Sequence, residues 1–384
     1  MITAREQLAA KPGEKQDRAV RASFVDVNEA YETWLRSQCE VDETALMLKH
    51  CRMRESAFVF LRGTFFRWAA EIENVLPELA AAQPVLSVGD AHVQNFGIWH
   101  DKEGRLVWGF NDFDDAAVAP YPIDLVRLAA SAILSRRSTL SRSEICDEIN
   151  NAYLDRITRP RPYVLNEKHW WLRQRVRASQ ASTARFWREM DELPATEPPP
   201  AVAKDLAGLL PRDCDEIKFA RRTAGGGSLG RPRFVAIAQW RRGRIVREAK
   251  ALVASGWDWS RGRKPHIRYL EVANGPSRSP DPNLRISHGF LLRRLSPESR
   301  KLEFGEGDNI KIDRLLLKAM GEELGSIHGA DQSAAKKIVN HLRGLDGGWL
   351  ESAADKAEKF VRSDFREWKK ATADLRCDGL KRDR

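Results

Sequence analysis

Three short motifs, and the order in which they occur, constrain this sequence more than any other feature. A Gly-Asp-Ala-His-Val-Gln-Asn segment occupies residues 89–95, and a Phe-Asn-Asp-Phe-Asp segment occupies residues 110–114. A glycine-rich segment follows much later, at residues 225–230. Acidic loops and a glycine loop form a site only where they meet, so the chain has to fold back and bring these segments together.

The composition is that of a globular chain. With 384 residues, of which 42% are hydrophobic, the sequence is long enough for two packed lobes, each with a sizeable core. No apolar run approaches the roughly 20 residues that a membrane helix needs. The first residues are polar and lack the apolar core of a signal peptide. We therefore expect a cytoplasmic protein with no membrane partner.

The charge balance favours anionic partners. The net charge is +10, which suits a nucleotide and a nucleic acid equally well. Solvated strand positions are the alternative interpretation of the arginines that crowd around the glycine loop. These arginines are Arg221, Arg222, Arg231, Arg233, Arg241, Arg242, Arg244 and Arg247.

The cysteines indicate neither a disulfide framework nor a zinc site. The five are scattered, odd in number, and form no CxxC pair. Both kinds of framework need paired or closely spaced cysteines. We expect all five to be reduced thiols.

Apolar periodicity divides the chain into parts and predicts the α+β class, with a small antiparallel β lobe and a larger helical lobe. Short strands at residues 85–88 and 106–110 end at the two acidic motifs, and a Pro-rich stretch at 194–200 separates the lobes. The parts are an N-terminal helical region (1–84), the part of the helical lobe with the catalytic loop and metal site (85–193), a nucleotide-binding β lobe (201–300) and C-terminal helices that complete the helical lobe (310–384).

Five strand-like runs make up the predicted β lobe. The glycine loop joins the first two runs, and an Arg-Arg-Gly turn at 241–243 joins the second to the third. The runs are residues 216–223, 233–240, 244–249, 267–273 and 286–295.

The acidic motifs contain the residue types that phosphoryl transfer needs, namely a carboxylate for the acceptor hydroxyl and oxygen ligands for magnesium. Asp90 and Asn95 are five residues apart, as are the base and the metal-binding amide of a kinase catalytic loop. Asp112 follows a further strand, where a carboxylate can bridge magnesium to phosphates. We predict Asp90 as the base and Asn95 and Asp112 as metal ligands, with Asp114 a further ligand or a turn residue. Taken singly, each fits a turn or cap equally well.

The glycine loop predicts a phosphate cradle, because its backbone N–H groups can approach an anion closely. The flanking strands fit a nucleotide hairpin better than a P-loop, since no Gly-Lys-Ser/Thr follows. A flexible hairpin tip is the alternative. The next strand should present a cation to the phosphates, and we expect Arg247 there, with Lys250 as a candidate on the opposite strand face. The loop residues are Gly225, Gly226, Gly227, Ser228 and Gly230.

Four further residues have two interpretations each. Arg52 and Arg62 can contact an anionic acceptor from the N-terminal helices or brace loops. His92 is expected to shape its loop rather than bind metal. Asp124 follows Tyr-Pro at a helix start, which indicates an N-cap or a loop brace.

Several segments together resemble an uncharacterised bacterial family, domain of unknown function 2252. They are residues 52–53, 58–63, 89–97, 111–114 and 124–131, and the resemblance continues through 225–230, 247–249, 292–295 and 324–328. The family usually shows Lys-Glu-Ala where this chain has Arg247-Glu248-Ala249. Arginine and lysine differ in reach and geometry, so this departure bears on catalytic activity.

That family is in turn similar to the aminoglycoside phosphotransferase and protein kinase-like superfamily. The resemblance carries the base role to Asp90, a magnesium role to Asn95 and the metal-binding Asp role to Asp112. Residues 324–328 resemble the helix that normally precedes the catalytic loop, yet they lie near the C-terminus. The resemblance therefore implies a two-lobed, kinase-like fold in circularly permuted order.

Together these features favour a phosphotransferase that uses ATP and Mg²⁺, or Mn²⁺, to transfer a phosphoryl or nucleotidyl group to an acceptor that the sequence does not identify. A nucleotide-binding pseudokinase or scaffold is the first alternative. A nucleic-acid-binding protein that uses the basic β lobe is the second. A metallophosphoesterase is disfavoured, because the later Gly-Asn-His-Glu motif is missing.

Overall fold

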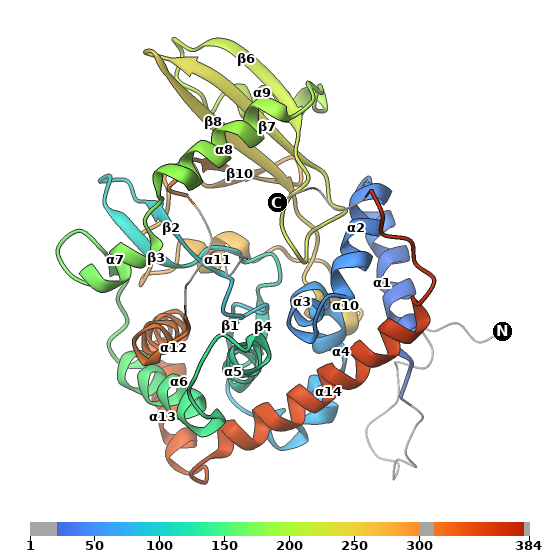
Figure 1. Cartoon of the computed structure of the whole chain (residues 1–384). Coiled ribbons are helices and arrows are strands. Elements are labelled where there is room, and N and C mark those ends of the chain that lie inside the picture. Colours follow the sequence, from blue (N-terminus) through green and yellow to red (C-terminus); the bar gives the residue numbers. More distant parts are fainter. Residues whose placement is uncertain (1–20, 300–310, 380–384) are drawn as a thin grey trace.

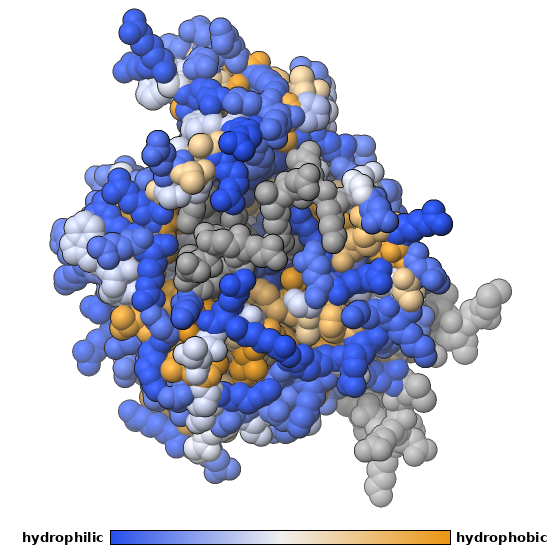
Figure 2. All heavy atoms as spheres, viewed as in Figure 1, coloured by the Kyte–Doolittle hydropathy of each residue, from blue (hydrophilic) through white to orange (hydrophobic). Residues whose placement is uncertain are grey.

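The computed structural model describes residues 21–299 and 311–379 and has a mixed α+β architecture with small antiparallel sheets (Figure 1). The larger sheet lies at one end of the molecule, and helices from the first and last parts of the sequence gather at the other. Hydrophilic residues cover most of the face viewed in Figure 1 (Figure 2). In the described ranges, no helix has the length and apolar character needed to cross a membrane.

The N-terminal part is helical, as predicted. Ser23, Asp42 and Ser56 start successive helices by accepting a hydrogen bond from a backbone N–H of the first turn. Two of these helices carry Arg52 and Arg62. The elements are α1 (Phe24–Gln38), α2 (Glu43–Met53), α3 (Ala57–Gly63), α4 (Phe65–Val75) and η1 (Pro77–Leu79).

Two small sheets hold the acidic motifs. The predicted strands at 85–88 and 106–110 are confirmed as β1 (Pro84–Ser87) and β3 (Leu106–Phe110). β1 pairs with β4 (Ala117–Pro120), and β3 pairs with both β2 (Phe96–His100) and β5 (Tyr163–Val164). The first acidic motif thus lies between β1 and β2, and the second between β3 and β4.

Among the described residues, the larger sheet has five antiparallel strands in the order β6-β7-β8-β10-β9. Its elements are β6 (Asp215–Arg221), β7 (Arg233–Trp240), β8 (Gly243–Ala251), β9 (Arg285–Ser287) and β10 (Phe290–Leu295). The predicted turn after β7 is confirmed, and Arg241 and Arg242 both have positive φ, as a type I′ hairpin turn requires. α8 (Gln180–Glu192) packs on one apolar face of the sheet and α9 (Pro200–Ala207) on the other.

Two strand predictions in this region were wrong. Residues 267–273 form helix α11 (Tyr269–Ala273), because buried Tyr269, Val272 and Ala273 follow helical i, i+3, i+4 spacing. The single strand predicted at 286–295 is instead the β9–β10 hairpin, whose turn residues His288 and Gly289 have positive φ. The predicted number of strands is therefore right, and β6, β7 and β8 match the predicted runs, but the last two strands do not.

The two helical parts of the sequence share one hydrophobic core, as predicted. Phe24 and Trp368 are in edge contact, with ring centroids 5.6 Å apart. A Cβ at Gly321 would lie 2.5 Å from the carbonyl oxygen of Ile149, so this glycine allows two helices to approach closely. The helices are α5 (Pro122–Ser135), α6 (Arg142–Ile157), α7 (Trp170–Val176), α10 (Gly256–Ser260), α12 (Arg314–His328), α13 (Gln332–Arg343) and α14 (Trp349–Ala371).

The prediction of five reduced cysteines was wrong. Cys51 on α2 forms a disulfide with Cys377, which follows α14. The segment after α14 returns to α2, and Arg54 donates to the carbonyl oxygen of Leu375 there. Scattered spacing in sequence could not reveal this tertiary contact. Cys39, Cys146 and Cys214 are free thiols.

Candidate functional site

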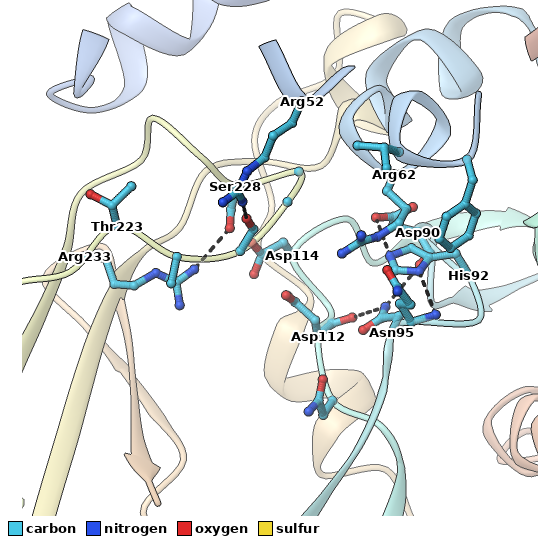
Figure 3. Close-up of a pocket in the computed structure, with 18 of the residues that line it drawn as sticks. Arg52, Arg62, Asp90, His92, Asn95, Asp112, Asp114, Thr223, Ser228 and Arg233 are labelled. Carbon is cyan, nitrogen blue, oxygen red and sulfur yellow. Dashed lines mark hydrogen bonds and ion pairs between the residues drawn. The ribbon is translucent and has the colours of Figure 1, made fainter. Parts of the chain in front are cut away.

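A cavity of about 1850 Å³ is lined by both acidic motifs and the glycine loop. Its wall also includes residues from α2, α3, α8 and α14, from the C-terminal ends of α5 and α7, and from the larger sheet. Figure 3 shows Ser228 and Arg233 on one side of this pocket, Asp90 and Asn95 on the other, and Asp112 between them. The predicted meeting of the glycine loop with the acidic loops is therefore confirmed.

Asp124 braces the loop that carries Asp90. Its carboxylate accepts hydrogen bonds from the backbone N–H groups of Val88, at 2.7 Å, and Gly89, at 3.1 Å. Gly89 has φ +79°, and a Cβ there would lie 2.1 Å from the carbonyl oxygen of Asp115. Asp124 is fully buried within the first turn of α5 and makes no capping hydrogen bond. The loop-brace interpretation holds, and the N-cap interpretation was wrong.

Asp90 is held by a buried arginine. Arg127 donates to Asp90 Oδ1 from Nε at 2.8 Å and from one terminal nitrogen at 2.5 Å. His92 Nε2 lies 3.5 Å from Asp90 Oδ2. Burial alone would raise the pKa of Asp90, but Arg127 and His92 outweigh burial and hold its pKa below the usual range. Asp90 is thus an ionised carboxylate in a fixed orientation.

Asn95 ties the two acidic motifs together. Its side-chain amide N–H groups donate to the carbonyl oxygens of Asp90, at 3.1 Å, and Asp112, at 2.9 Å. Its Oδ1 is buried and has no hydrogen-bond partner among the residues that the structure describes, which is uncommon for a buried polar atom. His92 shapes the same loop, since its Nδ1 accepts the backbone N–H of Gln94 at 3.1 Å.

Asp112 and Asp114 share a lysine from the sheet. Lys250 Nζ lies 2.9 Å from Asp112 Oδ1 and 2.6 Å from Asp114 Oδ2. Arg231, directly after the glycine loop, donates to Asp114 at 3.1 Å. Burial, followed by repulsion from Asp112, raises the pKa of Asp114 despite these cations. The two neighbouring carboxylates therefore repel each other even with Lys250 and Arg231 beside them, and a further cation would reduce this repulsion.

The oxygen atoms at this point fit a divalent cation that a ligand helps to coordinate. In the described part of the chain, no hydrogen-bond donor reaches Asn95 Oδ1 or Asp114 Oδ1. Within residues 21–299 and 311–379, no cluster of three or more His, Cys, Asp or Glu side chains is arranged to hold a metal on its own. Mg²⁺ is usually held by one or two carboxylates together with substrate phosphates, and this donor set matches that pattern.

The glycine loop packs against the two helices that carry Arg52 and Arg62. Arg52 donates to the carbonyl oxygen of Gly225 at 3.3 Å. A Cβ at Gly227 would lie 2.8 Å from the carbonyl oxygen of Arg62, so the close approach requires glycine. Arg233 donates to Ser228 Oγ at 3.1 Å and holds the loop from the sheet side. Gly226 lines the cavity beside them, whereas Gly230 packs on Leu46.

A buried glutamate accepts hydrogen bonds from three arginines on the side of the sheet that faces the cavity. Glu248 accepts hydrogen bonds from Arg222 and Arg233, each at 3.0 Å, and from Arg293 at 2.7 Å. Burial would raise the pKa of Glu248, but the arginines hold it well below the usual range. The cluster keeps a net positive charge, which suits an anionic ligand.

The placement of Arg247 in the site was wrong. Its Nε donates to the carbonyl oxygen of Leu209 at 3.1 Å, and neither Arg247 nor Lys250 is among the described residues that line the cavity. Side chains alternate along a strand, so Glu248 and Lys250 share one face of β8 and Arg247 points to the other. Lys250 is the cation of this strand that reaches the acidic motifs.

Sequence reasoning missed Arg127 and Arg231. Arg127 lies three positions after Asp124 in the same helix, and i, i+3 positions share a helix face. That spacing could have predicted a second brace for the loop. No comparable signal separates Arg231 from the other arginines near the glycine loop.

Comparison with known families agrees with part of the resemblance. A family described as an uncharacterized protein conserved in bacteria (DUF2252) matches residues 41–190. The matched part contains both acidic motifs, Asp124 and Arg127, and it ends before the glycine loop. No curated protein and no solved structure matches the chain.

Proposed function

We propose that this protein transfers a phosphoryl group from Mg·ATP to an acceptor hydroxyl, with kinase-like lobes in circularly permuted order. The observation that carries the proposal is the buried Asn95 Oδ1, which lacks a hydrogen-bond donor among the described residues, while Asn95 and the glycine loop line the same cavity. Buried polar oxygens are rarely left without a partner unless a ligand or ion completes them. The resemblance of the motifs to a kinase catalytic loop supports the same role.

Asn95, Asp112 and Asp114 would hold the Mg²⁺ ion. When bound, the ion would neutralise charge on the transferred phosphoryl group. The fit rests on their oxygen atoms, since hard divalent cations prefer carboxylate and amide oxygens. Mn²⁺ has the same preference.

The protein's own residues supply orientation and charge. Arg127 fixes the Asp90 carboxylate, which would accept the proton of the acceptor hydroxyl. The acceptor oxygen forms a bond to the γ-phosphorus, and the bond from that phosphorus to the β–γ bridging oxygen breaks, with its electron pair leaving on ADP. The glycine loop and Lys250 would bind the triphosphate.

The permuted arrangement is supported by how the late segments return to the first acidic motif. His328 lies at the end of α12, and its Nε2 is 3.1 Å from Oδ2 of Asp124, the residue that braces the Asp90 loop. This places the 324–328 segment beside the loop that it would directly precede in an ordinary kinase.

A thermal-shift experiment tests the proposal. Binding to the native state alone stabilises it, by about 2.7 kcal/mol at a ligand concentration about 100 times Kd. We expect ATP to raise Tm when Mg²⁺ or Mn²⁺ is present and to lose most of this effect with a chelator. Asp112→Asn should lose the metal-dependent part. Equal stabilisation by ATP with and without chelator would reject the metal-assisted site.

A nucleotide-binding pseudoenzyme is the second candidate, and the Arg127–Asp90 pair favours it. A carboxylate with a lowered pKa is a weak base. Mg·ATP binding without ATP hydrolysis or transfer would select this candidate over the phosphotransferase.

A further inference from the structure

The cavity is larger than one nucleotide requires. Small-molecule sites usually enclose about 300–1,000 Å³, whereas this cavity measures about 1850 Å³. Asp90 is among the residues that line this volume. There is room for a second ligand beside the nucleotide.

The wall is strongly basic. Its described residues include thirteen arginines against seven aspartates and glutamates. On the sheet side the arginines already have carboxylate partners: three share Glu248, and Arg231 pairs with Asp114. Those charges are partly neutralised before any ligand binds.

Three other lining arginines, here named the acceptor-side arginines, are Arg136, which directly follows α5, and Arg185 and Arg188, which lie on α8. Their side chains line the cavity and make no hydrogen bond or ion pair within the described part of the chain. Nearby, Arg175 pairs with Asp313 and Arg177 lies 3.8 Å from Glu298. Arg136, Arg185 and Arg188 therefore keep a positive charge that no carboxylate in the described part of the chain compensates.

Two helices set the position of these arginines. Phe186, Met190 and the following Leu193 pack on the sheet, so Arg185 and Arg188, at i and i+3, lie on the remaining face of α8. α5 holds Asp90 through Arg127 and ends at Arg136. The same helix thus links Arg136 to the carboxylate of Asp90.

We propose that the acceptor is a small molecule that already carries a phosphate group, which the acceptor-side arginines bind while its hydroxyl reaches Asp90. This inference rests on the proposed phosphotransferase. Guanidinium groups form paired hydrogen bonds with phosphate, and uncompensated ones gain most from an anion. The cavity volume of about 1850 Å³ is suited to a nucleotide together with a second small molecule.

Anion binding to nucleotide-loaded protein tests the inference. Calorimetry would measure the affinity for pyrophosphate and for glycerol 3-phosphate, with glycerol as the neutral control, in saturating Mg²⁺ and a non-hydrolysable ATP analogue. The Arg185→Ala/Arg188→Ala variant should bind both anions about tenfold or more weakly, as expected for lost charged hydrogen bonds. The Lys336→Ala/Lys337→Ala variant, which removes the same charge from exposed positions of α13, should match wild type.

The outcomes separate this inference from the proposed function. Equal anion affinity in the arginine variant and wild type would overturn the inference while leaving Mg·ATP binding intact. Failure of the ATP analogue to bind, with pyrophosphate affinity still dependent on Arg185 and Arg188, would overturn the phosphotransferase and retain the anion site. An oligonucleotide that binds more tightly than pyrophosphate, with a steep salt dependence, would replace the small-molecule acceptor with a nucleic acid.

Discussion

His328 Nε2 lies 3.1 Å from Asp124 Oδ2, although the two residues are 204 positions apart in sequence. Both side chains are fully buried. His328 Nδ1 is also 2.9 Å from the hydroxyl of Tyr153. Both contacts are satisfied if the tyrosine O–H donates to Nδ1 and the Nε2–H of His328 donates to Asp124. The C-terminal part of the chain thereby helps to hold the carboxylate that braces the Asp90 loop.

We expect Asp124→Ala to destabilise the fold strongly. The change leaves the backbone N–H groups of Val88 and Gly89 buried without an acceptor, and each such group costs about 1–3 kcal/mol. Urea unfolding should show a loss of about 2–5 kcal/mol. Asp331→Ala, which removes an exposed helix cap on α13, should cost only about 1 kcal/mol. Equal losses in the two variants would contradict the bracing role.

Lys250→Met should weaken Mg·ATP binding, and Arg247→Met should not. Lys250 reaches Asp112 and Asp114, whereas Arg247 bonds to the carbonyl oxygen of Leu209 on the other face of the strand. Loss of a charged hydrogen bond costs about 1.5–3 kcal/mol, or about tenfold to a hundredfold in Kd. Calorimetric titration of both variants checks this difference, and the reverse order would restore Arg247 to the site.

Asp90→Asn should slow turnover by about 10²- to 10⁴-fold and change nucleotide affinity little. Asparagine preserves shape but cannot take the acceptor proton, and Asp90 does not hold the proposed phosphates. Asn95→Ala should impair both quantities, because its oxygen would bind the metal. ATP hydrolysis and Mg·ATP binding, measured side by side, distinguish the two. Unchanged hydrolysis in Asp90→Asn would remove this residue from the mechanism.

The sequence was most informative where chemistry and spacing coincide. Asp90, Asn95 and Asp112 could be singled out because their residue types and separations suit a metal and phosphates. Their meeting with the glycine loop followed from the same requirement, since neither part forms a site alone. The bracing role of Asp124 was one of two alternatives, and only its hydrogen bonds to the backbone of Val88 and Gly89 separated them.

The positions of side chains and segments in the tertiary structure could not be predicted in the same way. Alternation shows that Arg247 and Lys250 face opposite sides of a strand, but not which side meets the acidic loops. The segment 267–273 contains Tyr269 and Val272, which suit strand and helix equally in so short a run. The contact between Cys51 and Cys377 depends on where the chain after α14 returns, and no local pattern encodes that position.

Cys377→Ser should lower the free energy of unfolding. The disulfide links residues 326 positions apart, and such a cross-link typically contributes about 2–4 kcal/mol, mainly by restricting the unfolded chain. Urea unfolding without reductant measures the difference from wild type. Dithiothreitol should lower wild type to the level of Cys377→Ser and leave that variant unchanged. Cys39→Ser, at a free thiol, is the matched control and should keep the wild-type response to reductant.

The burial of Lys49 predicts that the free energy of unfolding depends on pH in a specific way. It is 3% exposed, and its Nζ lies 5.7 Å from the ring centre of Phe66. Burial lowers the pKa of Lys49 from 10.5 to about 8, although Glu32 partly opposes this effect. Between these two values the unfolded chain binds more protons at this residue than the folded chain. The contribution of Lys49 to the free energy of unfolding therefore rises as pH rises through this window.

Lys49→Met should accordingly stabilise the protein near neutral pH. Below pH about 8 the folded state has to bury a charged amine, and the neutral methionine removes a cost of about 3 kcal/mol. The advantage over wild type should shrink as pH rises from about 8 to 10.5. Urea unfolding at several pH values through this window measures the difference, with Lys336→Met at an exposed position of α13 as the control. A stability difference that stays constant or grows with pH would show that Lys49 is not the titrating group.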